Sequence, residues 1–287
     1  MENKAVVKLN RYIDSMPSLS ITMAKILEVT KNPQVTAKDL NKVINLDPVL
    51  TGKVLKLVNS AYYGLPNKVT SLVNAIIMLG INTIKNLALS SAVLANMKKK
   101  NRFKSLNGDG FWRHSIGVGV GAKLIASKIG IPTNQREQYF IGGLLHDVGK
   151  IPLNEVFDEQ YMKAVSSADL KNRPLVEMEE ETIGINHTQV GKMIAEKWRL
   201  TGETYECILN HHNPENTSEG SEKLITAVHL ADIYCNMHQV GFSGNRYIKK
   251  IDPERLALLG ITEEFLDDLF FDTISDEIEK AQVFLKV

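Results

Sequence analysis

Residues 142–150 have the sequence Gly142-Gly143-Leu144-Leu145-His146-Asp147-Val148-Gly149-Lys150. The apolar spacing before the His146–Asp147 pair predicts a helix from Gln135 to Leu145 that runs into the pair. Adjacent helical residues point about 100° apart, so the two side chains cannot form one straight stripe, although both can reach ions at the flank of a helix. The pair is therefore a candidate metal-binding motif.

Further histidines and a second aspartate extend this motif. Imidazole nitrogen and carboxylate oxygen together suit divalent zinc, manganese, iron or nickel. An isolated histidine on an amphipathic helix is more often a hydrogen-bonded core or surface residue, so the prediction depends on the whole set. If the set converges, it is too large for one tetrahedral ion and predicts two metals. The candidate ligands are His114, His146, Asp147, His187, His211, His212 and Asp232.

The surroundings of Asp232 support its role as a ligand, whereas two other histidines fall outside the ligand pattern. Asp232 lies within the apolar stretch 228–233, where an unpaired carboxylate would be costly. A metal or a histidine partner would remove that cost. His229 and His238 have no place in the ligand pattern, and we expect structural roles for them.

The composition predicts a soluble globular protein. The chain has 287 residues, is 44% hydrophobic and 23% charged, and contains no apolar run of about 18 residues that would predict a membrane span. Its first residues lack the apolar run of a secretory signal, which favours the cytoplasm. Cys207 and Cys235 are too far apart for a CxxC motif, and we expect both to be buried and reduced.

Charge is distributed unevenly along the chain. Up to Ser105 there are 16 Lys and Arg against 5 Asp and Glu, a net charge of +11, whereas the remainder has 18 against 28, a net charge of −10. Opposite charges of this size could help the two segments dock on each other, which we favour, or could give each a separate partner. The basic run 98–102 is expected to be a solvated helix end or linker.

The segment 1–105 predicts a compact bundle of short helices and no half-buried strand. Thr36 followed by Asp39 has the form of a helix N-terminus, Ser71 is a second cap, and Gly80 a helix end. The predicted helices cover residues 21–29, 36–46, 49–58, 71–79 and 82–97.

The segment 106–287 also predicts helices, most of which carry candidate ligands. The first contains a glycine stripe at Gly117, Gly119 and Gly121, which predicts close approach of another helix. The acidic, amphipathic tail from Pro253 to Lys286 is expected to be helical too. The other predicted helices cover residues 112–129, 135–145, 187–199, 205–212 and 224–240.

These motifs together resemble the HDOD family, the HD-related output domains of bacterial signalling, from about Met16 to about Leu269. The resemblance implies an all-α fold in which a helical N-terminal bundle packs on an HD-domain, phosphodiesterase-like helical domain. The motifs that carry it are Asp47-Pro48-Val49-Leu50, Leu57-Val58-Asn59-Ser60-Ala61-Tyr62-Tyr63-Gly64, Ser71, Ala75, Leu79-Gly80, Phe111-Trp112-Arg113-His114-Ser115, the stretch 142–150, His187, Gly191 and Trp198.

The resemblance also implies roles for the candidate ligands. In HD phosphohydrolases one metal is held by residues that correspond to His114, His146, Asp147 and Asp232. Two-metal relatives add three histidines, here His187, His211 and His212, with Asp147 bridging the ions. Two such cations bind phosphate oxygens and generate hydroxide at neutral pH. Lys150 could steady a phosphate, although a lysine at a helix end is more often solvated.

One departure from the catalytic relatives limits the implied activity. Phosphodiesterases of the HD-GYP type carry a glutamate after the paired histidines and then a Gly-Tyr-Pro signature. This chain has Asn213-Pro214-Glu215-Asn216 and lacks that signature. Hydrolysis of cyclic di-GMP is therefore disfavoured.

Two classes of function stay open. The first, which we favour, is a non-enzymatic signalling module that acts through a protein partner and holds metal as a structural or sensing element. The second is a metal-dependent phosphohydrolase acting on a nucleotide or another small phosphoester, in which Asp147 and Lys150 would be catalytic. Nucleic-acid binding by the basic bundle is a weaker alternative, because no residues suited to reading base edges are evident.

Overall fold

The computed structural model describes residues 4–98 and 105–287, so the basic run 98–102 lies almost entirely outside the described residues. The described residues form helices joined by turns and contain no strand, which confirms the all-α prediction. The N-terminal helices are α1 (Lys4–Ser15), α2 (Ile21–Val29), α3 (Ala37–Ile44), α4 (Pro48–Val58), α5 (Leu72–Leu79) and α6 (Ile81–Lys98).

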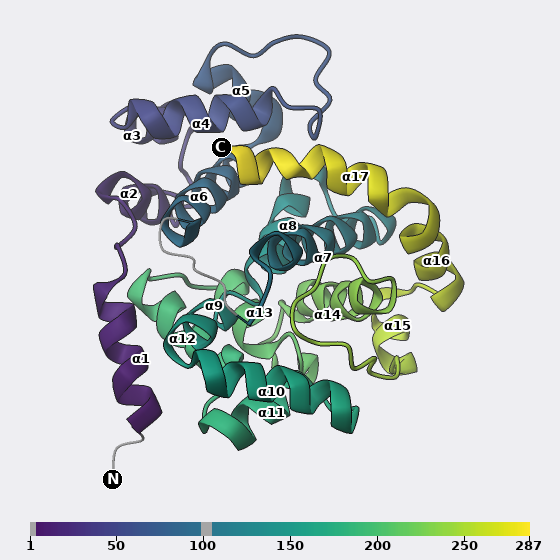
Figure 1. Cartoon of the computed structure of the whole chain (residues 1–287). Helices are drawn as coiled ribbons and strands as arrows, with labels where there is room; N and C mark the ends of the chain where they lie inside the picture. Colours follow the sequence, from purple (N-terminus) through teal and green to yellow (C-terminus); the bar gives the residue numbers. More distant parts are fainter. Residues whose placement is uncertain (1–3, 99–104) are drawn as a thin grey trace.

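Longer helices follow in the second segment, where α7 and α8 run through the middle of the molecule (Figure 1). The elements are α7 (Gly108–Lys128), η1 (Thr133–Gln135), α8 (Arg136–Leu145), α9 (Lys150–Val156), α10 (Asp158–Lys171), α11 (Leu175–Ile183), α12 (His187–Lys197), α13 (Glu203–Asn210), η2 (Pro214–Asn216), α14 (Glu222–Met237), α15 (Pro253–Leu259), α16 (Glu263–Asp268), the π-helical turn η3 (Leu269–Thr273), α17 (Ile274–Ala281) and η4 (Gln282–Lys286).

Helices α2 to α6 match the predicted bundle, and the predicted caps are present. Thr36 and Asp39 form a reciprocal capping box at the start of α3. The Ser71 hydroxyl accepts the backbone N–H of Asn74, and Gly80 ends α5 at φ +87°. Side-chain caps satisfy backbone donors that the first turn of a helix leaves free, which explains why the helix starts were visible in the sequence.

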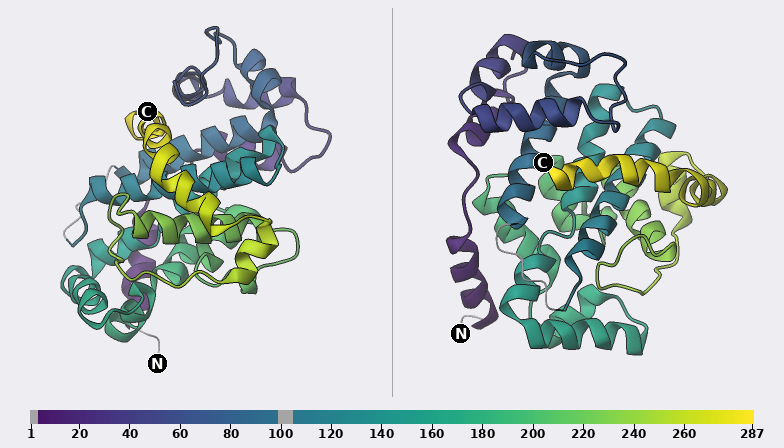
Figure 2. Two further views of the ribbon diagram at one scale, coloured as in Figure 1. Left: turned by 90° about the vertical axis from the view of Figure 1, so that its right-hand side faces the viewer. Right: turned by 45° about the horizontal axis from the view of Figure 1, so that its top comes forward.

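Helix α1 was not predicted. Its apolar residues Ala5, Leu9 and Ile13 recur every four residues and are buried. They pack against α9 and α12 of the second segment, not against the bundle (Figure 2). A short amphipathic helix of this kind depends on tertiary packing for most of its stability.

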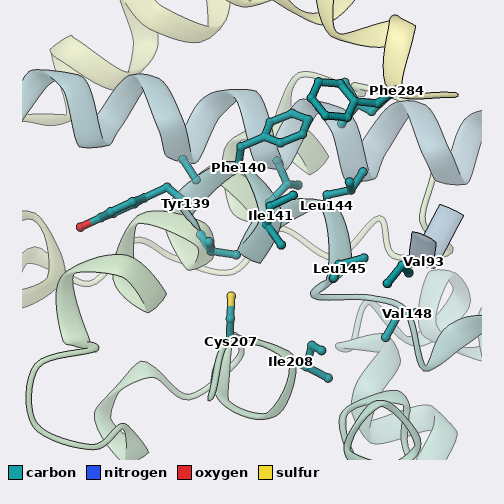
Figure 3. Close-up of a cluster of buried hydrophobic side chains, with 14 of the residues drawn as sticks. Val93, Tyr139, Phe140, Ile141, Leu144, Leu145, Val148, Cys207, Ile208 and Phe284 are labelled. Atoms are coloured by element: carbon teal, nitrogen blue, oxygen red, sulfur yellow. The ribbon is translucent and has the colours of Figure 1, made fainter. Parts of the chain in front are cut away.

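The glycines of α7 lie against neighbouring elements, which confirms their predicted role in packing: Gly119 faces α8, whereas Gly117 and Gly121 face α14 and the C-terminal elements. A Cβ on Gly119 would lie 2.7 Å from the carbonyl oxygen of Phe140, and a Cβ on Gly143 would lie 2.5 Å from the backbone nitrogen of Gly119. Apolar side chains of α8 then fill the space toward α13 and the C-terminus (Figure 3). Helix α8 is thereby held rigidly at the centre of the core.

Two stretches differ from the predictions. Helices α9, α10 and α11 lie at residues 150–183, for which no helices were predicted. The C-terminal tail is helical as predicted, but it is broken into α15, α16, the π-helical turn, α17 and η4.

Aromatic and polar contacts join the bundle to α7 and α8. The Tyr62 ring lies 5.3 Å from that of Phe140 and 5.2 Å from that of Phe284. The Lys123 ammonium donates to the Tyr62 hydroxyl and to the buried Glu137 carboxylate, both at 2.9 Å. No ion pair between described residues joins 4–98 to 105–287. Among the described residues, apolar and hydrogen-bonded contacts join the two segments at this junction.

Among the described residues, no single helix is long and apolar enough to cross a membrane. Helices α5 and α6 meet that standard only as a pair, and they are bent by 118° where they meet.

Candidate metal centre

The His146–Asp147 pair lies in a turn between α8 and α9 rather than on the helix itself, because α8 ends at Leu145. Short-range hydrogen bonds tighten this turn: the Val148 N–H donates to the Leu145 carbonyl at 3.1 Å, and the Lys150 N–H donates to the Asp147 carbonyl at 2.9 Å. The turn directs both side chains into a buried space lined by α7, α12 and α14.

The structure brings together all seven residues predicted as ligands. Three of them form one group, in which His114, His146 and Asp232 each offer an atom within 4.8 Å of the others. Nε2 of His114 lies 3.0 Å from Oδ1 of Asp232, and Nε2 of His146 lies 3.8 Å from the same oxygen. Asp232 thus has the partner that its apolar helix required.

A second group contains three histidines. Nε2 of His187 lies 2.9 Å from Nε2 of His212 and 3.4 Å from Nε2 of His211. His211 and His212 follow the end of α13 at Asn210, so the predicted helix over 205–212 stops before them. Three imidazole nitrogens that face one another this closely suit a shared cation.

Asp147 lies between the two groups. Its Oδ1 is 3.4 Å from Nε2 of His187 and 3.7 Å from Nε2 of His211, whereas its Oδ2 is 3.2 Å from Nε2 of His146. Its two oxygens therefore face different histidine groups. The buried Lys150 ammonium donates to Oδ2 at 2.7 Å, so this lysine is not the solvated residue that its position at a helix end suggested.

The shifted pKa values of Asp147, His211 and His212 favour metal binding, whereas Asp147 and Asp232 outweigh burial and raise the pKa of His146. Burial alone would raise the pKa of Asp147, but His146 and Lys150 beside it hold that pKa well below its usual range. Burial, together with the nearby His146, lowers the pKa of His211 well below its usual value, and burial with the nearby His211 does the same for His212. An ionised carboxylate and neutral imidazoles are the protonation states in which these groups ligate metals.

Two buried atoms without hydrogen-bond partners indicate whether a metal would fit the site. Nε2 of His146 and Oδ1 of Asp147 have no hydrogen-bond partner, although such buried atoms are normally paired. On His146 and His211 the other ring nitrogen is engaged: Nδ1 of His146 lies 2.6 Å from the Gly143 carbonyl, and Nδ1 of His211 lies 3.1 Å from the Cys207 carbonyl. Hydrogen bonds of this kind orient ligating histidines. The His and Asp clusters thus suit a divalent metal.

The other histidines and both cysteines lie outside the ligand groups. Nδ1 of His229 donates to the His211 carbonyl at 2.6 Å, which ties the backbone of the paired histidines to α14. His238 stacks on Tyr234 at a ring distance of 6.1 Å. Cys207 and Cys235 are buried and form no disulfide, as predicted.

Glu179 is a functional candidate that the sequence analysis missed. Its Oε2 accepts the His187 backbone N–H at 2.8 Å and lies 2.6 Å from Nδ1 of His187. This contact orients the ring so that Nε2 faces the metal centre. Glu179 belongs to the acidic run 177–181, which resembles a solvated helix face, and only its buried position on α11 distinguishes it.

We expect Glu179→Gln to weaken metal binding at the His187 group roughly 10- to 100-fold, because an amide orients the imidazole less firmly than a carboxylate does. Titration of chelator-treated protein with Zn²⁺, followed by calorimetry, measures the change. Glu177→Gln is the matched control, because Glu177 is exposed on the same helix and pairs with Arg173. Equal affinities in the two variants would rule out this role.

The family comparison agrees with this picture. The family model of the HDOD domain matches residues 16–214, so the chain belongs to the HDOD family. The match ends before Asp232, which the structure nonetheless places beside His114. An uncharacterized protein of Treponema pallidum (strain Nichols) is 26% identical over 222 residues, or 77% of this chain and 42% of that protein. The chain thus spans less than half of that relative.

Solved structures share the fold over nearly the whole chain. An HDOD domain protein of unknown function from Geobacter sulfurreducens is 24% identical, with a TM-score of 0.77 and 99% of each chain covered. A protein from Shewanella amazonensis SB2B, which its name places provisionally among the phosphohydrolases, is 22% identical, with a TM-score of 0.70 and 99% of each chain covered. At these identities the likeness concerns the fold.

Proposed function

We propose that this chain is a bacterial, cytoplasmic signal-transduction module whose HD-type site binds two divalent transition-metal ions. The observation that carries the proposal is the position of Asp147, whose two oxygens face two separate groups of ligand atoms. One ion would be held by His114, His146, Asp147 and Asp232, and the other by Asp147, His187, His211 and His212. Iron, manganese, nickel and zinc all suit these ligands.

The contact between the metal centre and the bundle supports a signalling role. Phe140 lies on α8, which leads directly into the His146–Asp147 turn, and its ring packs on Tyr62 of the bundle. A change at the turn would therefore reach the bundle through one buried helix. The bundle also exposes Ile77 and Met78, with 70% and 54% of their surface accessible. We propose that a signalling protein is the partner of this module.

A metal-dependent phosphohydrolase is the second candidate, and the complete ligand set favours it. Two bound cations would supply charge for phosphate oxygens and an activated water. Asp147 would hold both ions, and the Lys150 ammonium, 2.7 Å from Asp147, would add positive charge beside a phosphate. The substrate would be a small phosphorylated molecule. Cyclic di-GMP stays disfavoured, because Asn213 and Pro214 follow the paired histidines, and sequence-specific nucleic-acid binding is not expected.

Hydrogen exchange on metal-free and metal-loaded protein tests the signalling proposal. We expect about two transition-metal ions per chain by elemental analysis, and slower amide exchange in residues 57–64 after loading, because α8 couples the turn to Tyr62. Exchange in α16, which does not carry a ligand, is the internal control.

The outcomes separate the two candidates. A chain that takes up no metal contradicts both. Metal uptake without any change at residues 57–64 contradicts the coupling, and turnover in a screen of phosphomonoesters and phosphodiesters with added Mn²⁺ would then establish the phosphohydrolase. Coupling without turnover would establish the signalling module.

A further inference from the structure

The segment between α14 and α15 lies against the metal centre. It follows the end of α14 as an extended loop (Figure 1). The Phe242 N–H donates to the Gly110 carbonyl at 2.9 Å. At Gly241, φ is +67°, and a Cβ there would lie 2.4 Å from the backbone nitrogen of His114. Only glycine permits this approach, so the loop is held directly beside a proposed ligand.

This loop and the end of α14 line an open pocket of about 490 Å³. Small-molecule sites commonly measure about 300–1,000 Å³, so the space suits a ligand of moderate size. Its walls combine apolar and amide side chains: Asn236, Met237, Gln239, Phe242, Asn245 and Ile248, with Arg246 at one side.

The pocket borders a second, smaller hollow beside the metal centre. Asn236 and Asn245 also line a smaller hollow of about 40 Å³ whose other walls include His212 and Asp232. Nδ2 of Asn236 donates to Oδ1 of Asp232 at 2.9 Å. Lys249 lines the same hollow and donates to the His212 carbonyl at 3.1 Å. A ligand in the larger pocket would therefore lie next to the hollow at the metal centre, with Asn236 and Asn245 between the two spaces.

The chemistry of the larger cavity suits a flat heteroaromatic ring. The Arg246 guanidinium lies 5.1 Å from the centre of the Phe242 ring and pairs with Asp169 at 3.2 Å. Arginine and phenylalanine faces are the surfaces on which nucleobases stack. Asn236 and Gln239 offer both donors and acceptors, as the edge of a base requires.

We propose that this cavity binds the base of a nucleoside monophosphate whose phosphate lies at the metal centre. The phosphate would meet the ions and the Lys249 ammonium, while the base lies against Phe242 and Arg246. This assignment rests on the proposed metal site, and it names the class of phosphorylated molecule that the module senses or hydrolyses.

Calorimetric binding of AMP to the Mn²⁺-loaded full chain tests the proposal, with ribose 5-phosphate, inorganic phosphate and adenosine as further probes. We expect AMP to bind at least about tenfold more tightly than ribose 5-phosphate, because base stacking adds affinity. Phe242→Ala should weaken AMP binding about tenfold, and Arg246→Ala about fivefold. Arg246 is exposed, so its variant should fold even if the Phe242 variant does not.

Arg11→Ala is the matched control, because Arg11 is also exposed but lies on α1, far along the chain. Loss of AMP affinity in the cavity variants and not in the control supports the proposal. Equal binding of AMP and ribose 5-phosphate, or no AMP binding by metal-loaded protein, overturns it and leaves the metal site standing.

If the chain takes up no metal, the proposed function fails separately. Adenosine needs no metal, so its binding still tests the cavity. Weak adenosine binding that is lost in Phe242→Ala would support a base site, and the absence of adenosine binding would overturn it.

Discussion

Asp147→Asn is expected to reduce the metal content of the purified protein from about two ions per chain to fewer than one. Asp147 faces both groups, and as a shared ligand its negative charge would offset the repulsion between two bound divalent cations. Asparagine keeps the shape of the side chain but removes the charge. Elemental analysis of protein purified without chelator gives the answer directly.

His212→Asn sharpens this test. His212 belongs to the His187 group alone, so this variant should lose about one ion and keep the other. Asp14→Asn, a change of an exposed aspartate on α1, should retain both. Unaltered metal content in Asp147→Asn would refute the bridging role.

Asp147→Asn also leaves the buried Lys150 ammonium without its anionic partner, which is expected to cost about 3–5 kcal/mol of stability in metal-free protein. Circular dichroism must therefore confirm that the variant is folded before its metal content is interpreted.

Gly149→Ala is expected to destabilise the protein by about 3 kcal/mol or more and to disrupt metal binding. A Cβ at this position would lie 1.9 Å from the His187 carbonyl oxygen and 2.5 Å from the Gly191 backbone nitrogen. Both atoms belong to the backbone of α12, so no side chain can rotate to make room. The helix must move away from the turn, which separates His187 from Asp147.

Thermal unfolding measures this effect, with a fall in Tm of roughly 6–12 °C expected for a chain of this size. Gly52→Ala is the matched control, because a Cβ on Gly52 within α4 meets nothing within 4 Å. The control should raise stability by about 0.5–1 kcal/mol through the better helix propensity of alanine. Equal behaviour of the two variants would show that the turn and α12 are not in close contact.

Part of the fold could be predicted because it is encoded locally. Thr36 with Asp39, and Ser71 with Gly80, mark helix ends through hydrogen bonds between residues only a few positions apart. Apolar periodicity likewise located α2 to α8 and α12 to α14. By contrast, α1 and helices α9 to α11 are short or rich in charge, and their stability depends on neighbours that are distant in the sequence.

The residues of the candidate site likewise fall into those that the sequence could predict and those that it could not. The types and order of the ligand residues were evident in the sequence, because imidazole and carboxylate groups carry the metal chemistry by themselves. Glu179 was not evident, since its role depends on burial beside His187 and not on any spacing. The same holds for Asn236 and Phe242, which the sequence analysis did not single out.

The sequence by itself determined the helical class, the helix caps and the chemical identity of seven candidate ligands. Only the tertiary structure decided that Asp147 directs one oxygen to each histidine group, that Gly149 lies against α12, and that a cavity opens beside Asp232. The physical reason is the separation along the sequence over which each kind of interaction acts. Periodicity and capping act within a few residues, whereas these distances are set by the packing of α7, α8, α12 and α14 against one another.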